Sequence, residues 1–285
     1  MIPHCNLCPR RCGALRENSP AGRCNSPDNA VVAKVMLHHW EEPCISGECG
    51  SGVAFFSGCP LACVFCQNHY ISRGGVGEVC TPERLAKAFR ELESQGAHNI
   101  NLATGTHFAH QIIKALRIHR PGVPVVWNSG GYERPEIVDA LSLYIDVWLP
   151  DFKYALSDKA ERYSGAADYP EITLRAIERM KFHAPENIME DGIIKRGVII
   201  RHLVLPGNTR NSIEVLRLIA EHFPGTPVSL MSQYIPSGDA GNFPEINRRL
   251  TAREYAKVTE EAIRLGLDGY IQDISAASEI FVPDF

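Results

Sequence analysis

Three cysteines with short, uneven spacing are the residues in this chain best suited to chemistry. Cys59, Cys63 and Cys66 are separated by three and then two residues. Three thiolates on one tight loop leave one metal position open, whereas a structural zinc site is closed by four ligands. An iron–sulfur cube held by three thiolates keeps one iron free to bind another molecule. The spacing therefore favours a reactive iron–sulfur cluster, and the alternative is a zinc site completed by Cys80, Cys49 or a distant histidine.

A second group of cysteines lies near the start of the chain, in a segment interrupted by glycine and proline. Its members are Cys5, Cys8, Cys12 and Cys24. Four thiols are the number that a closed tetrahedral metal site needs. Zinc is one interpretation and an auxiliary iron–sulfur cluster is another, because the number of thiolates does not separate zinc from iron. A segment without metal is the third.

Composition and charge limit what the protein binds and where it works. The 285 residues are 45% hydrophobic and 22% charged, with a net charge of −4. No nucleic acid or anionic membrane partner is expected from this balance. No apolar run approaches the roughly 20 residues that cross a bilayer, and the first residues lack the features of a signal peptide. We therefore expect a cytoplasmic protein whose cysteines bind metal rather than form disulfides.

From residue 51 onward, short β-branched runs alternate with longer segments of helical period, which is typical of repeated β–α units. The predicted strands are residues 53–57, 99–103, 124–128, 145–151, 197–205, 226–232 and 269–272. The predicted helices are residues 82–95, 108–119, 135–142, 172–183, 212–222 and 252–265. Thr81 and Thr251 are expected N-caps, and Gly96 and Gly266 are expected where two helices end.

Six such units predict an α/β fold, namely a partial (β/α)6 barrel of the TIM type with its chemistry at the carboxyl ends of the strands. A doubly wound open sheet is the alternative, because the number of strands does not decide closure. We expect two parts: residues 51–285 form the barrel, and residues 1–50 form a Cys-rich metal-binding segment. That segment is too small to fold on apolar burial alone and would need a metal or the barrel surface.

The cysteine triad, with the aromatic Phe65 directly before its last member, resembles the signature of radical SAM enzymes. In that superfamily the free iron of a [4Fe–4S] cluster chelates S-adenosylmethionine, which is cleaved by one electron to methionine and a 5′-deoxyadenosyl radical. Thr104 and Gly105 match the Gly-Gly-Glu-type segment that receives the methionyl amino group. Thr106 or His107 stands where that segment has its glutamate.

Later strand ends resemble segments of glycyl-radical-enzyme activases. These are Asn128, then Asp151-Phe152-Lys153, then Arg201 with Pro206-Gly207-Asn208. The sequence HWEEPCISG at residues 39–47 is similar to that of uncharacterised members of the pyruvate formate-lyase-activating-enzyme-like branch. The resemblance covers nearly the whole barrel and implies membership of this branch.

Residues 38–42 contain histidine and glutamate and could be interpreted as metal ligands. We expect them to form a hydrogen-bonded lining instead. Cys44 and Cys49 lie in a Gly-rich loop that we place near the mouth of the barrel. A radical-accepting or substrate-binding thiol is one interpretation of these cysteines. We favour ordinary loop or buried residues for them and for Cys80.

S-adenosylmethionine brings a carboxylate and ribose hydroxyls, which need a cation and polar acceptors. Lys153 or Arg201 could supply the cation, and Asn128 or Asp151 the hydroxyl contact. Asp151 and Lys153 could instead only pair with each other. His202 is expected to pack behind the strand. Gln233 and Tyr234 could line the pocket or pack in the core, and the sequence does not decide between these alternatives. We expect no catalytic group beyond the cluster, and we assign these residues to the cofactor: Phe65, Thr104, Gly105, Asn128, Asp151, Lys153, Arg201 and Gln233.

The sequence thus predicts a radical SAM iron–sulfur enzyme, an activase-like oxidoreductase that acts on a backbone glycine of a partner protein. A mouth lined by Tyr70, Tyr132 and Tyr154 would suit an extended peptide. A flavodoxin or ferredoxin is the expected reductant. The alternatives are radical modification of a small molecule or nucleoside, and a non-catalytic iron–sulfur or zinc carrier.

Overall fold

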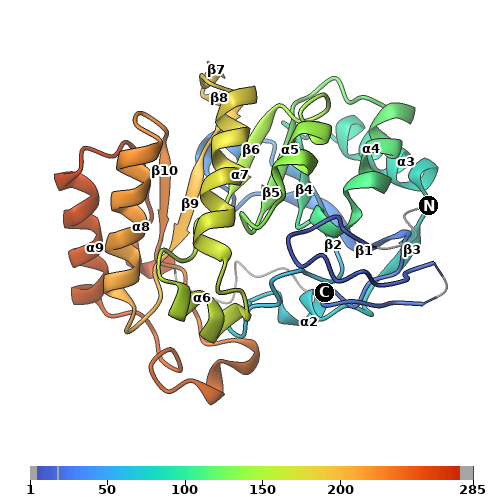
Figure 1. Cartoon of the computed structure of the whole chain (residues 1–285). Helices are drawn as coiled ribbons and strands as arrows, with labels where there is room; N and C mark the ends of the chain where they lie inside the picture. Colours follow the sequence, from blue (N-terminus) through green and yellow to red (C-terminus); the bar gives the residue numbers. More distant parts are fainter. Residues whose placement is uncertain (1–4, 18, 277–284) are drawn as a thin grey trace.

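The computed structural model describes residues 5–17, 19–276 and 285, and a mostly parallel β-sheet forms its centre (Figure 1). The strands are β1 (Ala30–His38), β2 (Ser51–Phe56), β3 (Glu78–Cys80), β4 (Ile100–Ala103), β5 (Val125–Ser129), β6 (Val147–Pro150), β7 (Ile188–Glu190), β8 (Ile193–Val198), β9 (Ile200–Leu203), β10 (Val228–Met231) and β11 (Gly269–Ile271). All seven predicted strands are present. The predicted strand 197–205 falls in two consecutive strands, β8 and β9, which are separated at Ile199 and belong to different sheets.

Strand pairing gives an open, partial barrel. One sheet has the order β3-β1-β2-β4-β5-β6-β8-β7, and a second has the order β11-β10-β9. A parallel bridge between Asp151 and Arg201 joins the end of β6 to β9, which links the two sheets. Among the described residues, no pairing joins β11 back to β2. The α/β fold with an unclosed parallel barrel, as predicted, is confirmed.

Helices lie on the outer side of the strands and, for α2 and α6, at one end of the strands (Figure 1). They are α1 (Pro43–Ser46), α2 (His69–Ser72), α3 (Pro82–Ser94), α4 (Ala109–Ile118), α5 (Pro135–Leu141), α6 (Ser157–Ser164), α7 (Tyr169–His183), α8 (Thr209–His222) and α9 (Ala252–Arg264). The side chain of Thr81 caps α3, and Thr251 forms a reciprocal capping box with Glu254, as the sequence predicts. In the described part of the chain, no helix combines the length and the apolar character needed to span a lipid bilayer.

Two helices begin earlier than predicted. The sequence predicts starts at residues 172 and 212, whereas α7 begins at Tyr169 and α8 at Thr209. Pro170 occupies the first turn of α7, where the missing N–H of proline has no helical partner to lose. The helical period of apolar residues reveals the middle of each helix but not this polar first turn.

Strand β1 is the largest element that the sequence did not predict. Its sequence AVVAKVMLH shows only as an apolar run, because no strict alternation marks it. It pairs antiparallel with β2, so that His38 lies opposite Ser51. The proposed domain boundary at residue 50 therefore falls between two neighbouring strands of one sheet.

The segment before β1 packs against the loops that follow β2 and β4. The buried Arg16 donates hydrogen bonds to the backbone carbonyls of His107, at 2.8 Å, and Ser26, at 2.9 Å. Gly58 has a φ of +83°, and a Cβ atom there would lie 2.4 Å from the carbonyl oxygen of Cys24. Only glycine fits at this close approach. The contacts hold the Cys-rich segment beside the cysteine triad.

Candidate active site

A cavity of about 440 Å³ opens where the parallel strands end. Its wall is formed by residues of β9 and by residues in or directly after β1, β2, β4, β5, β6, β10 and β11. Its lining contains Cys59, Cys63 and Cys66 together with Phe65, Thr104, Asn128, Asp151, Lys153, Arg201 and Gln233. The structure thus brings together every residue predicted for the triad and the cofactor except Gly105.

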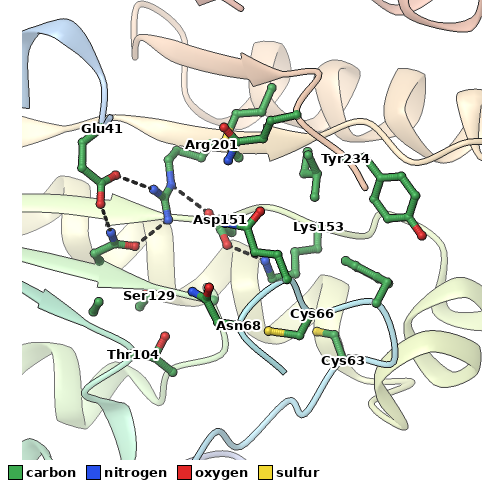
Figure 2. Close-up of a pocket in the computed structure, with 18 of the residues that line it drawn as sticks. Glu41, Cys63, Cys66, Asn68, Thr104, Ser129, Asp151, Lys153, Arg201 and Tyr234 are labelled. Carbon is green, nitrogen blue, oxygen red and sulfur yellow. Dashed lines mark hydrogen bonds and ion pairs between the residues drawn. The ribbon is translucent and has the colours of Figure 1, made fainter. Parts of the chain in front are cut away.

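The cysteine triad lies on the loop between β2 and α2, and Figure 2 shows two of its thiols beside the cavity. Burial raises the pKa of the Cys59 thiol to about 12, and the nearby Cys63 raises it as well. Such thiols become thiolates when a metal centre compensates their charge. Among the described residues, no other cysteine lines the cavity. Three thiols beside an open cavity fit a cluster that keeps one iron free.

A chain of charged side chains crosses the opposite wall of the cavity (Figure 2). Arg201 Nε donates to Asp151 Oδ1 at 2.8 Å, and the Lys153 ammonium pairs with Asp151 Oδ2. These three side chains are only 13–17% exposed. Burial opposes ionisation of Asp151, but Arg201 and Lys153 outweigh it and lower the pKa of this carboxyl. Asp151 is therefore a carboxylate shared by two cations.

Glu41 completes this network from the segment after β1. Its Oε1 accepts hydrogen bonds from the amides of Asn101, at 3.2 Å, and Asn128, at 3.1 Å. Arg201 Nη1 donates to Glu41 Oε2 at 3.1 Å, and Arg201 also donates to Asn128. Asn99, directly before β4, donates to the backbone of α1 and so fixes this segment at the starts of the strands. The predicted hydrogen-bonded lining is present at Glu41.

Arg201 and Lys153 differ in what remains available for a ligand. The Arg201 guanidinium already donates to three acceptors of the protein. Lys153 pairs with Asp151 and lies close enough to the triad to oppose the rise that burial causes in the pKa of Cys66. Lys153 is therefore the better placed cation for a carboxylate bound beside the cluster.

The loop after β4 contributes one of its two predicted residues. Thr104 lines the cavity with a φ of +61°, a conformation that few residues other than glycine adopt. Its N–H donates to the carbonyl of Asn128 at 2.8 Å. Gly105 points the other way: a Cβ atom there would lie 2.5 Å from Ile112 and 3.1 Å from the Trp127 ring. Glycine is needed at this position for packing.

Aromatic rings hold the cluster loop from one side. Phe65 makes edge contacts with Tyr154, Tyr163 and Tyr234, at centroid distances of 6.1–6.5 Å. Gln233 and Tyr234 both line the cavity. Tyr70, one of the three tyrosines predicted for the mouth, is exposed but does not line the cavity. The predicted tyrosine mouth is wrong, because Tyr154 is fully buried and Tyr132 lies beneath Arg10 at 3% exposure. These rings are core residues, since the hydroxyl of Tyr154 has a buried partner.

Two further expectations have different outcomes. His202 is buried and bonds to the carbonyl of Phe152 rather than lining the cavity, as predicted. The place expected for Cys44 and Cys49 is wrong. Both precede β2 and therefore lie at the amino ends of the parallel strands, opposite the triad. Cys44 is buried and Cys49 is exposed, as ordinary structural or loop cysteines are.

Glu133 is a buried acid behind the cavity wall. It is fully buried, and its Oε1 accepts a hydrogen bond from the Thr106 hydroxyl at 2.7 Å. Burial raises the pKa of this carboxyl to about 7. Glu133 thus links the loops after β4 and β5 with a side chain that titrates near neutral pH.

Glu133→Gln should change how stability depends on pH. The folded-state pKa lies above the ordinary value of 4.5, so the stability from the neutral carboxyl is complete below about pH 4.5 and is lost as the pH rises through about 7. The gap between the two pKa values corresponds to about 3 kcal/mol. Urea unfolding should be measured at about pH 4 and about pH 8. Relative to the parent, the free energy of unfolding of the variant should be higher at about pH 8 than at about pH 4 by about that amount. An equal difference at both pH values would contradict the assignment.

The second cysteine group is gathered but not arranged around one point. Cys8 has a pKa raised to about 12, first by burial and further by the nearby Cys24, Cys5 and Cys12. Three of the four are buried, and Cys12 is exposed. Within the described ranges, no group of three or more His, Cys, Asp or Glu side chains has a geometry that could hold a single metal ion. All ten cysteines are free of disulfides.

Several residues of the site were not predicted. Asn68 lines the cavity two residues after the triad, and its buried Oδ1 has no hydrogen-bond partner in the described protein. Its position in the triad loop was a usable signal. Ser129 follows Asn128 directly and could have been found in the same way. Asn101 carried no such signal, because it lies within a strand and reaches the network only through Glu41.

Known proteins resemble this chain in sequence and, more distantly, in structure. The model of the radical SAM superfamily matches residues 53–219. The uncharacterized protein MJ0674 of Methanocaldococcus jannaschii is 32% identical over 278 residues, covering 94% of this chain and 77% of that protein. A domain of pyruvate-formate lyase-activating enzyme from Bacteroides vulgatus is a distant structural neighbour, with a TM-score of 0.38 and 17% identity over 67% of this chain and 91% of that one. The chain belongs to the radical SAM superfamily, whose enzymes use a [4Fe–4S] cluster and S-adenosylmethionine.

Proposed function

We propose that this protein cleaves S-adenosylmethionine reductively and uses the resulting radical to activate a partner protein at a backbone glycine. The observation that carries the proposal is one cavity bounded by three thiols on one side and a buried Arg–Asp–Lys network on the other. The cluster, when bound, supplies one electron to the sulfonium and an open iron that chelates the methionyl group. The chain's own residues must then place the rest of the molecule.

The charges of the lining suggest where each group of S-adenosylmethionine binds. Lys153 would pair with the carboxylate, because Arg201 already donates hydrogen bonds to three acceptors of the protein. Asp151 would accept hydrogen bonds from the ribose hydroxyls, and the amide of Asn128 would donate to them or accept from them. Thr104 would present its backbone to the amino group, with Gly105 contributing backbone alone. Phe65 and Gln233 would bound the nucleoside side of the cavity.

The choice of a protein substrate rests on the activase-like segments at Asn128, Asp151–Lys153 and Arg201. A flavodoxin or ferredoxin would deliver the electron. Cys5, Cys8, Cys12 and Cys24 would bind zinc or a second iron–sulfur cluster beside the triad loop, which their segment contacts at Gly58. Radical modification of a small molecule or nucleoside is the competing outcome.

Anaerobic reconstitution with iron and sulfide tests the chemistry. With dithionite and S-adenosylmethionine, the loaded protein should form 5′-deoxyadenosine, which chromatography detects. Absence of both this product and S-adenosylmethionine binding would favour a carrier of metal or electrons. Incubation with candidate glycyl-radical enzymes should then give a stable glycyl radical in electron paramagnetic resonance. Product formation without such a radical would favour the small-molecule reaction.

Lys153→Met should weaken S-adenosylmethionine binding roughly 10- to 100-fold, because a charge-assisted hydrogen bond contributes about 1.5–3 kcal/mol. The fold should persist, since Asp151 keeps Arg201 as a partner. Titration calorimetry on cluster-loaded protein measures the change in Kd. Lys87→Met is the matched control, on the exposed face of α3 with 73% of its side chain accessible. Equal affinities for the two variants would exclude Lys153 from the carboxylate site.

A further inference from the structure

One cluster cysteine has a hydrogen-bond donor that comes from a distant part of the chain. The Oγ atom of Ser164 lies 3.0 Å from the Sγ atom of Cys63. On its other side, the same hydroxyl lies 2.9 Å from the hydroxyl of Tyr154. Ser164 is 1% exposed and is the last residue of α6, and Gly165 ends that helix in the left-handed conformation. The three polar atoms form a buried row behind the cluster loop.

The chemistry of a ligated cysteine orients this row. A thiolate bound to iron carries no proton and can only accept a hydrogen bond. Ser164 has one hydroxyl proton, which must then be directed at Cys63, so that the serine oxygen accepts from Tyr154. Tyr154 retains its proton, because burial raises its pKa well above the ordinary value.

We propose that Tyr154 and Ser164 form a hydrogen-bond relay that donates to the Cys63 thiolate and raises the reduction potential of the cluster. This inference rests on the proposed function, because it assumes that the triad binds the cluster. One-electron reduction adds a negative charge that spreads over the cluster and its sulfurs. A donor aimed at a ligand sulfur stabilises the reduced state more than the oxidised state. The relay would make reduction by a low-potential protein donor easier.

Arg10, from the Cys-rich segment, holds both sides of this relay. Its guanidinium donates to the carbonyl of Ser164 at 2.7 Å and to the carbonyl of Pro60, in the cluster loop, at 3.0 Å. It also donates to the carbonyl of Gly165 and lies 5.3 Å from the ring centre of Tyr132. A cation at the carboxyl end of α6 satisfies carbonyls that the helix leaves unpaired. Arg10 is thus a positioning residue that fixes the distance between Ser164 and the loop.

An electron paramagnetic resonance redox titration of the reconstituted protein, without S-adenosylmethionine or partner, tests the relay. Ser164→Ala should move the cluster midpoint potential to a more negative value at unchanged iron content. Tyr154→Phe and Arg10→Met should move it in the same direction by less. Ser164→Thr, which keeps a hydroxyl, should restore much of the parent value. Ser157→Ala, exposed at the start of α6, and Arg11→Met, exposed beside Arg10, are the matched controls.

The outcomes separate the relay from the wider function. A parent-like potential in Ser164→Ala would overturn the relay, even if the protein forms 5′-deoxyadenosine. A shift that threonine does not reverse would also overturn it, because packing would then be the cause. A shift that threonine reverses would support the relay even if no glycyl radical is ever detected.

Discussion

Cys59→Ala, Cys63→Ala and Cys66→Ala, combined in one variant, should abolish formation of 5′-deoxyadenosine and remove the iron and sulfide that the cavity binds. The effect should be complete, because no other described cysteine reaches this cavity to replace a lost ligand. The measurements are iron and sulfide per chain after anaerobic reconstitution, and chromatography of the nucleoside product.

Cys80→Ala is the control for this experiment. Cys80 is a buried thiol at the end of β3 and does not line the cavity, so its loss should leave the product unchanged. Iron that persists in the triple variant without product would report on the second cysteine group. Product from the triple variant would refute the assignment of the cluster.

Arg201→Met should lower the free energy of unfolding by about 3 kcal/mol or more. The substitution leaves Glu41 without its cation and Asp151 with Lys153 alone, in a region where these carboxylates are only 10–14% exposed. Removing one partner of a buried ion pair costs about 3–5 kcal/mol, because the other charge stays buried. Urea unfolding of parent and variant measures the loss.

A second substitution shows whether the loss comes from the ion network. Burial raises the pKa of Glu41 even with Arg201 present, so its charge is costly without that partner. Glu41→Gln combined with Arg201→Met should therefore recover part of the lost stability. Arg196→Met is the matched control, because Arg196 is exposed on the neighbouring strand β8. If Arg201→Met is no less stable than this control, the network does not stabilise the fold.

The residues of the candidate site could be brought together from the sequence because they follow strands directly. The triad comes after β2, Thr104 after β4, Asn128 near the end of β5 and Lys153 just beyond β6. The carboxyl ends of parallel strands lie at the same face of a barrel. Residues that directly follow predicted strands could therefore be expected to line one cavity. The apolar runs of the strands were strong enough to locate the parallel elements within a few residues.

The features of the site that could not be predicted depend on contacts between residues far apart in the chain. Ser164 meets Cys63 only after α6 folds over the cluster loop, a separation of 101 residues. Glu41 joins the network because β1 pairs antiparallel with β2. This pairing brings the segment after β1 to the amino ends of the parallel strands. Tyr154 follows Lys153 directly but points into the core, and residue type alone does not reveal that direction. Sequence periodicity does not encode such pairings.

The position of Glu41 also limits how far the protein can be shortened. A minimal chain cut to the region shared with the superfamily, residues 53–219, would keep the thiol loop, Asp151, Lys153 and Arg201. It would lack the carboxylate that receives the Asn101 and Asn128 amides, and the strands β10 and β11. The region that matches the superfamily is therefore shorter than the region that contains every partner of the buried charges around Arg201.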